Sequence, residues 1–538
     1  MSYTGEIGPK TVYGNETASQ ANPHGLTGDQ VEQMLLFTQS GTGAVQRTLD
    51  SKVKDFVSVK DFGAVGDGAT DDAAAVQAAF TASSRIYFPP GKYKLSVNIA
   101  KTMANAIDSF TVVGAGPDKT ILFWPNANGG LSITYAGGLN NSVTLSDFSC
   151  TTAQAGGGTA INLFNSVSNA SPANAAQNNL SHITFRGDDG YSSTNYWTTC
   201  IAINNVSSNN LNGIYFSGPT TRAGTGIVMV GLPASTTFAV VLNIASSIFN
   251  NLGVGVFYGN YVQGISVHQS QFNGCNNGID AGSTETGLDQ LVVTSSQFGL
   301  VGSQVGIQTS SPVYHTTIAN NLFIINGSST NAISLSSAAY FNIHGNELEC
   351  FNTTGTTGIN IGTMDAGTSG VIKGNQIYGF ATAISLGASS INVLVEGNNF
   401  LGHSTSISLN TTNISDSGTG NLIINNAGYN IAWTAFTPTV VVTGGTGTAT
   451  GSYQKNGKTV HFQMAITCTG SGTLSTTTLP FTANSRAMFA GREMVRTGTG
   501  WVGWSTGASN TMSATTVSNS AAMQTNDILS ISGTYEST

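Results

Sequence analysis

Two glutamates separated by one residue are the side chains in this sequence best spaced to do chemistry. Glu347 and Glu349 flank Leu348 in the segment 346–350. If Leu348 faces inward on a strand, both carboxylates point outward, roughly 6.5 to 7 Å apart. That spacing lies near the lower end of the roughly 6.5 to 9.5 Å typical of the acid and base in inverting glycoside hydrolysis. We therefore expect Glu347 and Glu349 to be the catalytic pair, and the alternative is two solvated acids.

Other carboxylates form weaker candidate sites. Asp280, Glu285 and Asp289 cluster within residues 278–290 and make a second choice. Asp365 lies in a Gly- and Thr-rich loop that either overhangs a groove or is simply solvated. Glu396 aligns with Lys373 and His344 on adjacent copies of the repeat described below, which favours a surface ion pair between Lys373 and Glu396 over catalysis.

Outward-facing aromatic rings are candidates for stacking on sugars, although packing within the fold is the more common role of each such ring. The substrate-binding set expected beside the acids is His344, Lys373, Tyr378, Tyr314 and Tyr340, and further outward aromatics are Tyr196 and Trp197. The residues point to no metal site and no cofactor.

The element that must position these side chains is a repeat of roughly two dozen residues. Its clearest copies occupy 267–272, 293–298, 318–323, 343–348, 372–377 and 395–400, and a second strand follows each copy at 278, 306, 332, 358, 383 and 406. In each copy the Gly-Asn or similar pair interrupts the alternation of apolar residues, which indicates a bend. The period predicts an all-β solenoid in which Asn321, Asn346, Asn375 and Asn398 stack into a structural ladder.

Residues 56–80 are expected to begin this solenoid. A strand from Val57 to Phe62, a Gly-Asp-Gly turn at 66–68 and a helix N-capped by Thr70 or Asp71 are predicted. The stripe at 76, 79 and 80 would let the helix cover the first coil.

Both ends of the chain differ from the repeat. Residues 1–55 contain one plausible short helix, 28–37, and are too few to bury a core alone. Residues 432–538 show short strands and Gly-rich turns, with a type I′ turn signal at Asn456-Gly457. They predict an antiparallel β-sandwich.

The segments 56–80, 85–95 and 110–122 resemble, in order, the opening elements of the pectate lyase-like superfamily of right-handed parallel β-helices. The C-terminal segment resembles the sandwich of phage tail fibres and tailspikes. Together they resemble bacteriophage tailspikes that depolymerise polysaccharides.

That resemblance implies a homotrimer with a virion-attachment segment at 1–55, a β-helix with a capping helix at 56–431, and a sandwich for trimerisation or carbohydrate binding at 432–538. It implies a bacterial surface polysaccharide (O-antigen, capsule or exopolysaccharide) as ligand and a phage tail or baseplate protein as partner. It also implies synthesis in the host bacterial cytoplasm before incorporation into the virion. A non-catalytic receptor-binding spike and a polysaccharide lyase or epimerase remain alternatives.

Few basic residues accompany the acids, and this favours a glycoside hydrolase over a polysaccharide lyase. Uronate lyases of the resembled superfamily use an acid cluster that binds calcium and an Arg or Lys base. Residues 102–431 contain only Lys119, Arg186, Arg222 and Lys373. A metal-free lyase with Tyr378, His344 or His268 as base stays open. Asp188-Asp189 matches one fragment of the polygalacturonase pattern, but the other parts of that pattern are missing.

Composition narrows the function classes. A net charge of −8 with 18 Lys and Arg argues against nucleic acid as partner. The sequence has no run of 18 apolar residues and no signal-peptide pattern, so we expect neither membrane insertion nor signal-peptide secretion. The five cysteines have no paired spacing and are expected to be buried thiols.

Overall fold

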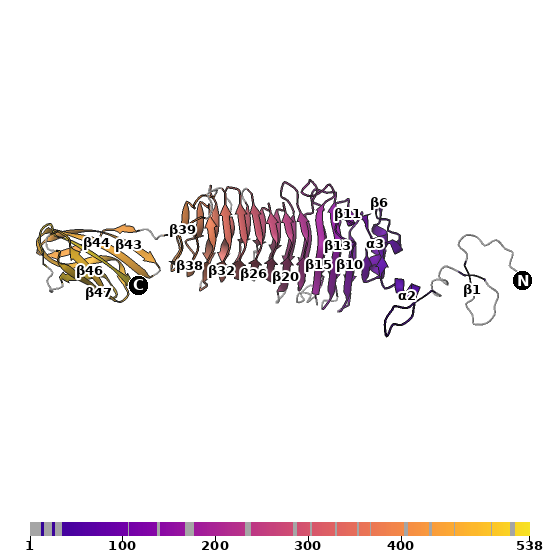
Figure 1. The fold of residues 1–538 in the computed structure, drawn as a ribbon, viewed down its shortest axis with the longest axis horizontal. Coiled ribbons are helices and arrows are strands. Elements are labelled where there is room, and N and C mark those ends of the chain that lie inside the picture. The colour runs from indigo at the N-terminus through magenta and orange to yellow at the C-terminus, as the bar shows by residue number, and fades with distance from the viewer. Residues whose placement is uncertain are drawn as a thin grey trace. The chain divides into compact units, whose positions relative to one another are not determined.

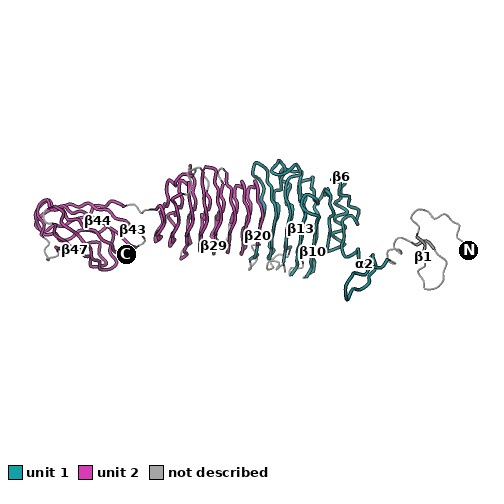
Figure 2. Tube along the Cα trace, in the orientation of Figure 1, with its two compact units in different colours: residues 1–228, 234–242 teal, residues 229–233, 243–538 magenta. Residues whose placement is uncertain are grey.

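The structure, a computed structural model, describes residues 12–14, 24–26, 35–105, 107–136, 140–166, 177–231, 238–282, 288–301, 304–328, 331–351, 354–365, 367–402, 407–429, 433–456, 458–495, 498–516 and 522–538. They belong to two compact units, residues 1–228 with 234–242 and residues 229–233 with 243–538 (Figure 2). In the described part of the chain, no helix is long and apolar enough to span a membrane.

The N-terminal segment contains short paired elements. They are β1 (Val12–Gly14) with β2 (His24–Leu26), β3 (Leu36–Phe37) with β4 (Arg47–Thr48), and the helix α2 (Leu49–Val53). The helix predicted at 28–37 lies mostly outside the described residues, and its last two residues are wrong because they form β3.

The start of the solenoid differs in detail from its prediction. The strand β5 covers only Val57–Ser58, because a 3₁₀-helix, η1 (Val59–Phe62), follows immediately with Ser58 as its cap. After β6 (Asp67–Asp71), the helix α3 (Ala73–Ala82) buries the predicted apolar stripe. Its N-cap is Asp72 rather than Thr70 or Asp71, and the buried Asp72 carboxylate instead accepts the backbone N–H groups of Val65 and Gly66. The turn is thereby fixed against the helix.

The remaining strands of the first unit pair in parallel, as a solenoid requires (Figure 1). One series is β7 (Arg85–Tyr87), β8 (Gly91–Lys94), β10 (Ser109–Val113), β11 (Thr120–Trp124), β13 (Ser142–Thr152), β15 (Gln177–Gly187), β17 (Asn209–Asn212) and β18 (Tyr215–Ser217). A second series is β9 (Ile99–Met103), β12 (Leu131–Tyr135), β14 (Thr159–Asn165) and β16 (Thr199–Asn204). The strands β19 (Thr225–Val230) and β20 (Ala239–Ala245) fall where the division into units lies.

The second unit repeats a coil of three strands. The first strands are β23 (Val262–His268), β26 (Leu288–Thr294), β29 (Val313–Ala319), β32 (Phe341–His344), β35 (Gly370–Lys373) and β38 (Val393–Glu396). After a bend come β21 (Ile248–Asn250), β24 (Gln271–Asn273), β27 (Gln297–Leu300), β30 (Leu322–Ile325), β33 (Glu347–Cys350), β36 (Gln376–Tyr378) and β40 (Leu422–Ile424). The third strands are β22 (Val254–Tyr258), β25 (Asn277–Ala281), β28 (Val305–Thr309), β31 (Asn331–Ala338), β34 (Thr357–Met364), β37 (Thr382–Leu386) and β39 (Thr412–Asp416).

One third strand lies later than predicted. The copy expected at 406 begins outside the described residues, and residues 407–409 do not form a strand. The strand β39 instead begins at Thr412 and pairs Ile414 with Ile384. Asn410 explains the delay, since its side chain bonds the Phe380 N–H and the Ile377 carbonyl and so occupies the preceding turn.

The predicted asparagine ladder is confirmed at the bend. The Asn375 Oδ1 accepts both the backbone N–H and the side-chain amide of Asn346, at 3.0 and 2.9 Å. Its Nδ2 donates to the carbonyl of Ile343 and to Asn398, both at 3.0 Å. The same pattern links Asn321 to Asn346 and Asn398 to Asn426. A left-handed residue precedes each ladder position, for example Gly374 with φ 62°, so the bend was correctly assigned.

Behind the bend, aromatic rings stack from coil to coil. Phe249, Phe272, Phe298 and Phe323 are fully buried, and consecutive ring centroids are 4.5, 4.8 and 4.6 Å apart. The parallel register that brings strands together therefore also brings identical side chains together.

The C-terminal residues form a ten-stranded antiparallel sheet around a hydrophobic cluster of their own. Its strands are β41 (Thr434–Phe436), β42 (Val440–Thr443), β43 (Thr446–Asn456), β44 (Thr459–Gly470), β45 (Gly472–Ala483), β46 (Arg486–Glu493), β47 (Gly500–Thr506), β48 (Ser509–Thr516), β49 (Ala522–Met523) and β50 (Ile528–Glu536). The predicted hairpin is confirmed, but Asn456 pairs with Thr459 and so ends a strand instead of entering the turn.

Candidate functional site

The predicted catalytic pair lies on the second strand of one coil. Glu347 and Glu349 are partly exposed on β33, and Leu348 between them is fully buried. In register, Leu322 and Gln376 neighbour Glu347. Ile324 and Tyr378 neighbour Glu349. The acids therefore share one face, and no neighbour in their strand columns is charged.

Tyr378 lies beneath this face. Its ring is only 1% exposed, which corrects the expectation of an outward ring available for stacking. Its hydroxyl donates to Gln376 Oε1 at 2.7 Å and accepts from Asn399 Nδ2 at 3.2 Å. Burial, and then the charges of Glu347 and Glu349, raise the pKa of Tyr378. The two glutamates and this hydroxyl thus form one electrostatic group.

The next column holds the predicted surface ion pair. Lys373 Nζ lies 3.2 Å from Glu396 Oε2, and the lysine side chain is 60% exposed. His344 is the register neighbour of Lys373 on the preceding coil. The ion pair is confirmed, and it occupies the outer end of the strands that lead into the glutamate face.

A second group of candidates lies where the third strand of a coil gives way to the next first strand. Asp289 Oδ1 is 2.8 Å from His315 Nδ1, and the Tyr314 hydroxyl donates to Asp365 Oδ2 at 2.8 Å. The rings of His315 and Tyr340 stack with centroids 5.8 Å apart and planes 16° apart. The structure thus joins Asp289, Asp365, Tyr314 and Tyr340, which the sequence suggested only one by one.

His315 is the member of this group that sequence reasoning missed. Its φ of 57° is left-handed, as is the φ of 61° at Gln290, its register neighbour. A left-handed residue interrupts alternation, so Tyr314 and His315 both face outward although they are consecutive. No turn signal marks this position in the sequence, because neither residue is Gly or Asn.

Two buried polar atoms, the Tyr258 hydroxyl and Asp280 Oδ1, lie near this second group, at the corner where a third strand gives way to the next first strand. The Tyr258 hydroxyl is buried, and neither it nor Asp280 Oδ1 has a hydrogen-bond partner among the described residues. Burial, then the charges of Asp289 and Asp280, raise the pKa of Tyr258. Burial also raises the pKa of Asp280, despite hydrogen bonds from Gln308 and Asn277. Asp280 and Asp289 therefore lie close enough to act on one hydroxyl, while Glu285 lies outside the described residues.

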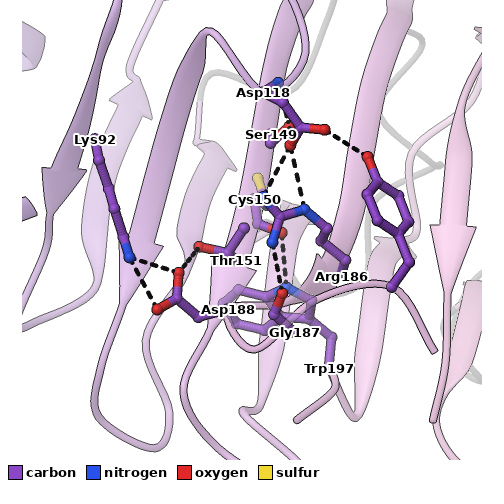
Figure 3. A network of polar contacts seen from close by, with 10 residues as sticks. Lys92, Asp118, Ser149, Cys150, Thr151, Arg186, Gly187, Asp188 and Trp197 are labelled. Atoms are coloured by element: carbon purple, nitrogen blue, oxygen red, sulfur yellow. Dashed lines mark hydrogen bonds and ion pairs between the residues drawn. The ribbon is translucent and has the colours of Figure 1, made fainter. Parts of the chain in front are cut away.

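A polar network in the first unit was also missed (Figure 3). Asp118 bonds Arg186 at 2.9 Å, and it also accepts the hydroxyl of Tyr191 and that of Ser149. Lys92 lies 2.7 Å from Asp188. Burial alone would raise the pKa of Asp118, but the hydrogen bonds from Tyr191 and Arg186 outweigh it and lower that pKa. The ion pairs Asp118–Arg186 and Lys92–Asp188 join residues 68 and 96 positions apart in sequence, so spacing gave no signal.

This network fixes the loop that follows β15. Asp189 accepts the backbone N–H groups of Thr194 and Asn195, and the indole N–H of Trp197 donates to the Cys150 carbonyl. Trp197 is 1% exposed, which corrects its assignment as an outward aromatic. Two ion pairs, Asp118–Arg186 and Lys92–Asp188, therefore flank the loop, and Asp189 holds it through backbone N–H groups.

In the described part of the chain, no three His, Cys, Asp or Glu residues are grouped so that they could hold a metal ion. All five cysteines are described, and they are buried thiols outside any disulfide, as predicted.

Comparisons with known proteins agree with this architecture. Residues 56–280 match the family model described as rhamnogalacturonase A/epimerase, pectate lyase-like. The chain is 44% identical over 63 residues to the tail spike protein of an Escherichia phage, covering 12% of this chain and 8% of that protein. It is 39% identical over 103 residues to the pre-neck appendage protein of Bacillus phage B103, covering 18% and 11%. The matches thus span about a tenth of the length of these curated relatives.

Among solved structures, the Dettilon tailspike protein aligns over 91% of this chain and 96% of its own, with 13% identity and a TM-score of 0.43. The predicted resemblance is confirmed by the family match and the phage relatives. The chain thus folds as a parallel β-helix in which residues 56–280 match a pectate lyase-like family model, and a short segment is similar to a phage tail spike protein.

Proposed function

We propose that this chain is a receptor-binding tailspike of a bacteriophage, and that it binds and cleaves a bacterial surface polysaccharide by glycoside hydrolysis. The observation that carries the proposal is the pair Glu347 and Glu349, two accessible carboxylates on one face of β33 with uncharged neighbours in their columns. The similarity to phage tail spike and appendage proteins supports the location on a virion tail.

In the proposed reaction, one glutamate protonates the glycosidic oxygen as the bond breaks, and the other removes a proton from the attacking water. The proton count balances, because one acid loses a proton and the other gains one. The buried Tyr378 hydroxyl supports the site from below by ordering Gln376 and Asn399, neighbours of Glu347 in its column. His344 and Lys373 are placed to contact the substrate at the outer end of the same coils.

The assembly is part of the proposal. Residues 1–55 attach the spike to a phage tail or baseplate protein, residues 56–431 form the β-helix, and residues 432–538 form the sandwich that holds a homotrimer or binds carbohydrate. The protein is made in the cytoplasm of the infected bacterium and carried on the virion.

The test is release of reducing ends from a panel of purified O-antigen, capsular and exopolysaccharides. Glu347→Gln and Glu349→Gln are each expected to lower turnover about a hundredfold or more, the scale for losing a general acid or base. Glu396→Gln is the matched control, because an exposed ion pair contributes at most about 1 kcal/mol.

Other outcomes identify the alternatives. Products with unsaturated sugars would assign a lyase, with Tyr378, His344 or His268 as candidate bases. Binding without any cleavage would assign a non-catalytic receptor-binding spike. Full activity in both glutamine variants, beside inactive Asp280→Asn or Asp289→Asn variants, would move catalysis to the corner of the coil.

A further inference from the structure

We propose that the corner formed by Asp289, Tyr314, His315, Tyr340 and Asp365 is a second carbohydrate-binding site, one that holds neutral sugars of the polysaccharide away from the glutamate pair. The proposal deepens the function above and rests on it, since it presumes a polysaccharide ligand. The corner is called the aromatic corner below.

The backbone presents more side chains at the aromatic corner than a regular strand would. The left-handed His315 lets Tyr314 and His315 point outward together. Tyr314 is 38% exposed and Tyr340 is 43% exposed, and the His315 side chain is 63% exposed.

The exposed rings offer the surface that a sugar covers. His315 and Tyr340 are nearly parallel and come from adjacent coils, so together they make a platform two coils long. The C–H face of a pyranose is apolar, and covering such rings removes apolar surface of both partners from water. Two coils in succession can therefore contact successive sugars of one chain.

The carboxylates are oriented acceptors for sugar hydroxyls. His315 Nδ1 holds Asp289 Oδ1, and the Tyr314 hydroxyl holds Asp365 Oδ2. Each carboxylate has a second oxygen, and hydrogen bonds from neutral donors to an ionised acceptor are strong. Fixing the carboxylates in advance lowers the entropy lost when a ligand binds.

Charge selects the class of ligand. The sequence has no Lys or Arg between 223 and 372, so no such cation belongs to this stretch of coils. An acidic polymer would meet two carboxylates without a compensating cation from these coils, whereas a neutral glycan supplies only hydroxyl donors. The aromatic corner therefore fits neutral sugars.

The site is distinct from the glutamate pair along the coil. β32 and the bend at Gly345 separate Tyr340 from Glu347, and four strand residues span roughly 13 Å. A polymer crossing β32 can reach both places, so the aromatic corner would raise affinity for long chains.

The experiment measures binding to an array of purified bacterial polysaccharides, neutral and acidic, with the full chain and three variants. Tyr340→Ala removes the outer ring, and Asp365→Asn keeps an acceptor for Tyr314 while removing the charge. Tyr191→Ala is the matched control, because Tyr191 is also an exposed tyrosine but lies in the first unit. Circular dichroism melts verify that each variant folds.

We expect Tyr340→Ala to weaken binding of a neutral polysaccharide about tenfold, Asp365→Asn to weaken it severalfold, and Tyr191→Ala to bind like the parent. Parental affinity in both corner variants overturns the inference, and so does a strict preference of the parent for acidic polymers.

Reducing-end release on the same array separates the two proposals. Cleavage with unchanged binding in the corner variants refutes only the aromatic corner, whereas corner-dependent binding without cleavage refutes only hydrolysis. A parent that neither binds nor cleaves any polymer refutes both.

Discussion

Replacing one rung of the asparagine ladder should measure how much the bend contributes to stability. In Asn375→Ala, Asn346 loses the acceptor shared by its backbone N–H and by one N–H of its side-chain amide. Both donors are buried, and the other amide hydrogen still has the Ile318 carbonyl. An orphaned buried donor costs about 1 to 3 kcal/mol, so two cost about 2 to 6 kcal/mol of unfolding free energy.

The assay is equilibrium unfolding in guanidinium followed by far-ultraviolet circular dichroism. Asn342→Ala is the control, because Asn342 is exposed on the coil of Asn346, one coil before Asn375, and its loss should cost no more than about 0.5 kcal/mol. Hydrogen exchange of residues 341–350 would localise the effect to the affected coil, since coils depend mainly on their neighbours. Equal unfolding midpoints for the two variants would refute the view that the ladder satisfies the bend.

Two further predictions concern pH and assembly. Burial raises the folded pKa of Asp280 above its unfolded value of about 3.9, so the folded chain binds the proton more tightly and stability falls as pH rises through that interval. Asp280→Asn should therefore raise the melting temperature near neutral pH and change it little at about pH 3, and an equal shift at both values would contradict the assignment. Deleting residues 432–538 should leave the β-sheet circular dichroism of the coils while lowering the fraction of the proposed homotrimer in light scattering, because the sheet of β41 to β50 has its own hydrophobic cluster. A truncated chain that remains fully trimeric and active would leave the sandwich without the proposed role.

The fold was predictable because its signals repeat. The sequence of each coil repeats the same bend residues and the same inward apolar residues. The ladder positions could therefore be aligned from spacing alone, at Asn321, Asn346, Asn375 and Asn398. The error at 406 arose where a similar apolar pattern occurred twice and Asn410 shifted the strand to the later copy.

The candidate site was predictable only where it follows the register. The outward placement of Glu347 and Glu349 and the pairing of Lys373 with Glu396 follow from alternation and from the parallel stacking of coils. The burial of Tyr378 did not follow alternation, because Ile377 and Tyr378 are consecutive residues of β36 and both are buried. The left-handed backbone at His315 likewise breaks alternation, and no glycine at this position predicts it from the sequence.

The stacked phenylalanines give successive coils of the second unit the same ring contact in their interior. Phe272 meets Phe249 on one side and Phe298 on the other at nearly the same distance, so each ring sees the same surroundings. A coil gained or lost in register would restore identical neighbours and leave no mismatch in the interior. The length of this part of the solenoid could therefore change by whole coils without disturbing the stack. The outer surface, where Asp289 and His315 differ from the residues at the same positions one coil away, can diverge without disturbing this stack.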